Sequence, residues 1–110
     1  MAQNEFSRPI QVTLDETNYI IWAQSMRIFL KGRKLWLYVT GDLKKPTKGL
    51  TESNETFFTR LIDWDSNNHQ ILMWLRDTTI PSISAMLGKF DDAKSAWDML
   101  ASRYSFTDGF

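Results

Sequence analysis

The chain has 110 residues, of which 43% are hydrophobic, and this composition suits a single globular domain with one modest core. Its 13 lysines and arginines balance its 13 acidic residues, so it lacks the positive surplus of domains that bind nucleic acids mainly through phosphates. The sequence contains no cysteine, which excludes disulfides, thiolate metal sites and a cysteine nucleophile within it.

Residues 1–16 are predicted to form an extended arm ahead of the helical part. Pro9 blocks a helix here and biases Arg8 toward an extended backbone. The arm lacks the basic start and the apolar run of a signal peptide, and no apolar run elsewhere is long enough to span a bilayer. We therefore expect a soluble, cytoplasmic protein with no membrane partner.

Two helices are predicted between residues 17 and 41. Thr17 or Asn18 can cap the first helix, and Gly32 can end it. A short second helix in "RKLWLYV" is closed by Gly41. Apolar residues of the first helix recur every three or four positions, a spacing typical of a stripe that faces a core. They are Tyr19, Trp22, Met26, Phe29 and Leu30.

A polar loop follows, and then the longest predicted helix, roughly from Glu55 to Thr78. Asn68 lies in the middle of its apolar face. A buried amide without hydrogen-bond partners costs about 1–3 kcal/mol. We therefore expect Asn68 to bond backbone groups of a neighbouring helix end or loop and to fix how the helices pack. The apolar residues of this face are Phe57, Leu61, Trp64, Ile71, Leu72 and Leu75.

Two shorter helices complete the predicted fold. Pro81 lies in the first turn of one and Gly88 at its end, while Asp91 or Asp92 caps the other. Five helices with an apolar period near 3.6 predict an all-α, compact bundle, with a helical lobe at 17–105 and a tail at 106–110. The predicted structural core consists of Tyr19, Trp22, Met26, Phe29, Trp64, Asn68, Leu72, Leu75, Trp97 and Leu100.

No residues form a pattern that predicts catalysis or a bound cofactor. His69 is the single histidine, and no second histidine, cysteine or paired carboxylate could complete a metal site with it. Asp63 and Asp65 are only two positions apart, so they do not face each other on a helix. The glycines form no phosphate-binding loop. We predict that the chain is not an enzyme and holds no cofactor or metal.

Two kinds of surface residue are candidates for binding a partner. Four basic residues, Arg33, Lys34, Lys44 and Lys45, can form a basic edge, either as ordinary solvated charges or as a weak site for nucleic acid. Three apolar residues, Ile20, Ile28 and Met73, are hard to place inside. They are either an interface or incidental surface hydrophobes, which are common.

Three segments, in this order and spacing, carry a recognisable combination of residues. "LDETNYIIWAQSMRIFLKGRKLWLYVTG" has Leu14, Asn18, Tyr19, Trp22 and Gly41 at the matching positions. "WDSNNHQILMWL" and "DDAKSAWDMLASRYS" follow with their own tryptophan patterns. Together they resemble the N-terminal capsid (Gag) domain of plant copia-type LTR retrotransposons.

The resemblance implies a helical capsid lobe that associates with itself in a virus-like particle, as a homo-oligomer or a capsid lattice. Gag proteins of this type usually add a second lobe and a zinc knuckle that binds RNA. We therefore expect this domain to bind RNA only weakly, if at all. The chain is then either a piece of a longer polyprotein or a domesticated, Gag-derived protein-interaction module. A nucleic-acid-binding module that uses the basic edge is the remaining alternative.

Overall fold

The computed structural model describes residues 8–106, and five helices follow one another along them. No strand lies in this part of the chain, so the predicted all-α bundle is confirmed. The first seven residues of the predicted arm and residues 107–110 of the predicted tail lie outside the described residues. The helices are α1 (Tyr19–Gly32), α2 (Trp36–Thr40), α3 (Asn54–Asp77), α4 (Pro81–Leu87) and α5 (Ala93–Tyr104).

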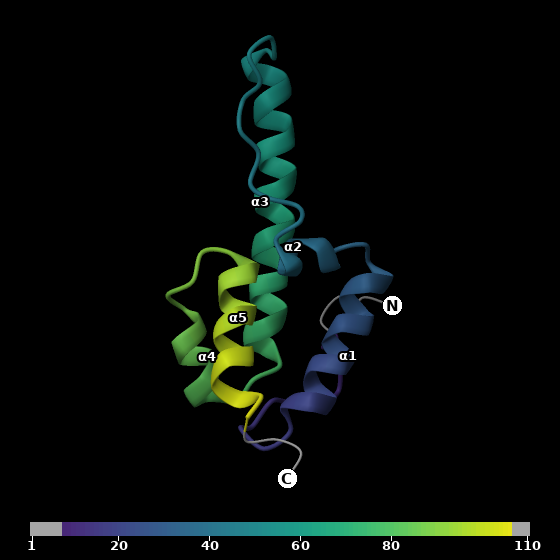
Figure 1. Cartoon of the computed structure of the whole chain (residues 1–110), viewed down its shortest axis with the longest axis vertical. Coiled ribbons are helices and arrows are strands. Elements are labelled where there is room, and N and C mark those ends of the chain that lie inside the picture. Colours follow the sequence, from purple (N-terminus) through teal and green to yellow (C-terminus); the bar gives the residue numbers. More distant parts are fainter. Residues whose placement is uncertain (1–7, 107–110) are drawn as a thin grey trace.

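The long helix α3 organises the rest of the molecule (Figure 1). Its C-terminal half packs against α4 and α5, whereas its N-terminal half projects beyond the bundle. The loop of residues 42–53 runs alongside the projecting half. The short helix α2 packs against α1 and α5. The projection makes the molecule long and thin, with extents of 53 × 37 × 24 Å.

The core lies where α1, α3, α4 and α5 meet, and Trp22 is its largest fully buried side chain. Its ring stacks on Trp97 with 5.3 Å between centroids. Its indole N–H donates to the hydroxyl of Thr78 at 3.1 Å. Of the predicted core residues, six are buried: Trp22, Met26, Asn68, Leu72, Leu75 and Leu100. Three are half-buried and pack against that core: Tyr19, Phe29 and Trp97.

Trp64 does not belong to the core, contrary to the expectation from its helical spacing. It faces α2 and the loop after it, and it lines a hollow with Asp91, Asp92 and Lys94 instead of packing in the buried cluster. Its indole N–H donates to the carbonyl of Leu43 at 2.9 Å, and its ring tilts against Tyr38 at 6.0 Å. The apolar face of α3 therefore continues further along the helix than the bundle that covers it.

The segment before α1 is anchored to the bundle through Leu14, which is fully buried. The Leu14 N–H donates to the carbonyl of Thr78 at 2.8 Å, and the Ile80 N–H donates to the carbonyl of Leu14 at 3.0 Å. These two bonds form one isolated parallel bridge between Leu14 and Thr79. The bridge pins the N-terminal segment to the turn between α3 and α4, so this part of the predicted arm is not a free strand.

Helix ends follow the sequence signals at most positions. Asp92 caps α5 by accepting from the N–H of Ser95 at 3.0 Å, which decides between the two predicted aspartates. Gly41 closes α2 with a φ of 86°, in the left-handed region that favours glycine. Asn18 precedes α1, but its side chain makes no cap bond. Its amide instead donates to the carbonyl of Thr13 at 2.8 Å, and this bond joins α1 to the preceding segment.

Candidate interaction surfaces

Asn68 joins the middle of α3 to the start of α5. Its side chain is 1% exposed. The amide nitrogen donates to the carbonyl of Asp91 at 2.7 Å, and the amide oxygen accepts from the N–H of Ala93 at 2.8 Å. Ala93 is the first residue of α5, and its N–H would otherwise lack an intrahelical partner. The prediction that Asn68 bonds the backbone of a neighbouring helix end is confirmed.

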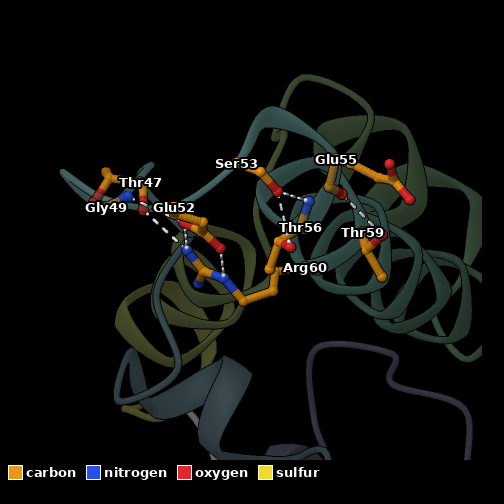
Figure 2. Close-up of polar contacts among 8 residues, drawn as sticks. All are labelled: Thr47, Gly49, Glu52, Ser53, Glu55, Thr56, Thr59 and Arg60. Atoms are coloured by element: carbon orange, nitrogen blue, oxygen red, sulfur yellow. Dashed lines mark hydrogen bonds and ion pairs between the residues drawn. The ribbon is translucent and has the colours of Figure 1, made fainter.

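The projecting half of α3 is held to its loop by Arg60 and Glu52 (Figure 2). Arg60 makes two parallel bonds to this carboxylate, from Nε to Oε2 at 2.8 Å and from Nη2 to Oε1 at 2.7 Å. Nη2 also donates to the carbonyl of Thr47 at 3.1 Å, and the Gly49 N–H donates to Glu52 at 3.0 Å. Ser53 caps α3 beside them by accepting from the N–H of Thr56 at 3.1 Å. The loop and the helix therefore form one unit at the tip.

These bonds lower the pKa of Glu52 from 4.5 to about 2, first through the hydrogen bonds from Arg60 and then through the Gly49 N–H. Because the folded pKa lies below the unfolded one, the bonds stabilise the tip fully above about pH 4.5, and that stabilisation is lost as the pH falls toward 2. NMR titration of the carboxyl group should therefore show a midpoint near 2.

The variant Arg60→Gln is the control for that titration. It removes the charge and the paired donors, so the midpoint of Glu52 should return toward 4.5. A midpoint that is near 4.5 in the natural chain, or that does not move in the variant, would contradict the tip geometry.

The four basic residues of the predicted edge lie in two pairs rather than in one patch. Lys44 and Lys45 line a hollow of about 610 Å³ beside Tyr38 and Trp64. Arg33 and Lys34 line a second hollow, which shares Tyr38 and Leu43 with the first. The guanidinium of Arg33 is turned onto aromatic rings, 4.7 Å from the centroid of Phe29 and 5.4 Å from that of Trp74.

The larger hollow has balanced charges. Besides its two loop lysines it is lined by Lys94, so three lysines and three aspartates line it. The carboxylates belong to Asp65, Asp91 and Asp92. A phosphate backbone that reached these lysines would also meet the acids, which lowers the gain expected from releasing counterions.

The three predicted interface residues are all exposed, but they lie on two helices. Ile20 and Ile28 belong to α1 and are 46% and 69% exposed, and Met73 belongs to α3 and is 52% exposed. Sequence reasoning missed the apolar residues of the projecting half: Phe58 at 52%, Ile62 at 66%. The exposure of Phe58 and Ile62 could have been predicted from the sequence, because both lie off the face of α3 that carries Ile71 and Leu75.

Within residues 8–106, no three His, Cys, Asp or Glu side chains are placed to hold a metal ion. The ring Nδ1 of His69 lies 2.9 Å from the backbone carbonyl of Asp65 and 3.4 Å from its carboxylate. No helix in the same part of the chain combines the length and the apolar content that crossing a membrane requires.

The first part of the chain is similar to a known family. Residues 7–47 match the sequence model of the family described as Gag-polypeptide of LTR copia-type. This segment is similar to copia-type Gag sequences. The copia-type match covers α1, α2 and the start of the following loop, which is less than half of the chain. It contains the first of the three resembling segments, while the likeness of the other two remains a prediction.

The copia-type Gag family is structural rather than catalytic. No curated protein and no solved structure matches the chain. The plant origin that the resemblance implies stays a prediction.

Proposed function

We propose that this chain is a capsid domain of a copia-type retrotransposon and acts by associating with itself in a particle shell. The observation that carries the proposal is the copia-type Gag match over residues 7–47. Exposed apolar side chains on two separate helices, α1 and α3, support it. A closed shell needs more than one contact face on each subunit, because a single twofold contact ends at a dimer.

The proposal assigns no catalytic, metal or cofactor role to the chain and places its action in the cytoplasm. It assigns RNA at most a minor part. The net charge of the chain is zero, and Lys44 and Lys45 share their hollow with three carboxylates. Many weak protein contacts, added through multivalency, are sufficient to hold a shell together.

Self-association should appear as a mass that rises with concentration. Each single contact in such a shell is expected to be weak, with a dissociation constant on the order of 0.1–1 mM. Sedimentation velocity of the whole chain, from micromolar to about millimolar protein, should therefore show species heavier than the monomer. A single monomeric species over the whole range would contradict the proposed function.

The variant Ile28→Asp tests whether α1 contributes one of these faces. It places a charge on the most exposed of the three predicted interface residues and should reduce the average mass at high concentration. Ser102→Asp is the control, since Ser102 is exposed on another helix, α5, and gains the same charge. Equal masses for the two variants would remove α1 from the proposed contact.

A further inference from the structure

The outward face of α3 carries a continuous stripe of exposed side chains, which we call the α3 stripe. Its members recur every three or four positions, apart from one step of seven residues between Ile62 and His69 that exposed Asp65 and Ser66 fill. They lie away from the face that buries Asn68, Ile71, Leu72 and Leu75. Three of them are large, apolar and more than half exposed, at 52%, 66% and 52% for Phe58, Ile62 and Met73. The α3 stripe consists of Glu55, Phe58, Ile62, His69, Met73 and Arg76.

The order of these side chains is self-complementary. The midpoint of the stripe lies between Asp65 and Ser66. Around a twofold axis at that midpoint, two copies of α3 run antiparallel, and residues equally far from the midpoint face each other. Phe58 then faces the second copy's Met73, and Ile62 faces the second copy's His69.

The same register brings opposite charges together at both ends of the pair. Glu55, in the first turn of α3, faces the second copy's Arg76, which lies in the last turn. Neither side chain forms an ion pair within residues 8–106 of a single copy. Both are exposed and therefore available to a second chain. Shifting the register by one helical turn would separate these charges, so they select one alignment.

The centre of the pair also has a compensating charge. Two Asp65 side chains come near the axis, and like charges there would oppose association. Lys45 lines the same shallow hollow as Ile62, Asp65 and Ser66, so each copy supplies an ammonium group beside these carboxylates. The projecting half of α3 reaches beyond the bundle, which gives a second helix access to this face (Figure 1).

We propose that a second copy of this chain binds antiparallel along the α3 stripe, about a twofold axis between Asp65 and Ser66. The proposal rests on the proposed function, because it names one face of the self-association. From Glu55 to Arg76 the paired stretch is about 32 Å long at 1.5 Å per residue. One helix pair of this length is a small interface, so the dimer is weak on its own and gains strength only inside a larger assembly.

Charge reversal with mixing tests the register. Glu55→Arg alone places arginine opposite arginine in its own dimer, and Arg76→Glu alone places glutamate opposite glutamate. Each variant should dimerise at least about 10-fold more weakly than the natural chain. An equimolar mixture restores two opposite-charge pairs in every heterodimer, so the heavier species should return. Because each chain keeps its own altered helix end in the mixture, a general loss of stability cannot produce this rescue.

Asp63→Arg is the control for the charge change. Asp63 is an exposed acid on α3 that lies outside the α3 stripe, so its reversal should leave the dimer unchanged. If the natural chain associates but the reversals have no effect, or if the mixture is not rescued, the α3 dimer is wrong while the proposed function stands. If the natural chain is monomeric throughout, both fail.

A crosslink provides a second readout that does not depend on charge. The chain contains no cysteine, so Ser66→Cys introduces a single thiol beside the proposed axis. A short bismaleimide should join two such chains into a covalent dimer in high yield. Ser102→Cys, an exposed serine on α5, is the matched control and should give little dimer. Equal yields from the two variants would overturn the proposed axis.

Discussion

The variant Asn68→Ala should lower the free energy of unfolding by about 2–4 kcal/mol. The truncation removes the acceptor of the Ala93 N–H and the donor to the Asp91 carbonyl, both within 2.8 Å of the amide. The N–H lies at the buried start of α5, where no intrahelical carbonyl replaces the lost acceptor. Urea denaturation followed by circular dichroism measures the change.

Asn67→Ala is the matched control, because it removes the same amide one residue earlier. The Asn67 side chain is only half-buried, and its amide donates to the hydroxyl of Tyr38 at 3.0 Å. Its loss should cost about 1 kcal/mol or less. Asn68→Asp separates the two bonds of the buried amide, since a carboxylate still accepts from Ala93 but cannot donate to Asp91. Equal costs at positions 67 and 68 would show that Asn68 does not hold α5 in place.

The features that depend on local pattern could be predicted from the sequence. The helical spacing of Trp22 and Met26 indicated one buried face, because any helix in this protein must turn its apolar stripe inward. Pro81 and Gly88 marked the two ends of α4 through their backbone preferences. Asn68 was predicted to bond a backbone because a buried amide must find a partner, and this argument needs no knowledge of which helix supplies it.

The features that depend on distant segments could not be predicted. Leu14 is a core residue only because it bridges to Thr79, and nothing in the local sequence indicates that pairing. Trp64 has the spacing of a core residue, but spacing gives the direction of a side chain and not how far the neighbouring helices extend along α3. Likewise, the positions of Arg33 and Lys44 in separate hollows follow from the path of the loop, which charge and spacing do not determine.

The largest single loss of stability is expected from Trp22→Ala, at about 3–5 kcal/mol. The side chain is fully buried, so its removal leaves a cavity between α1 and α5 as well as losing the transfer of the ring from water. The loss also removes the hydrogen bond to Thr78. A domain of this size has only about 5–15 kcal/mol of stability in total. Urea denaturation should place the variant close to unfolding, and one-dimensional NMR should show reduced dispersion.

Two further variants divide that loss into its causes. Trp22→Phe keeps an aromatic ring but loses the indole N–H, while the Thr78 hydroxyl still donates to the carbonyl of Trp74 at 2.9 Å. We expect about 1–3 kcal/mol for this change. Trp36→Ala removes a half-buried ring that packs edge-on against Trp97 at 5.3 Å, and it should cost less than Trp22→Ala because its pocket is already open to water. If Trp36→Ala destabilises the chain as much as Trp22→Ala, the centre of the core lies nearer α2 than the buried position of Trp22 implies.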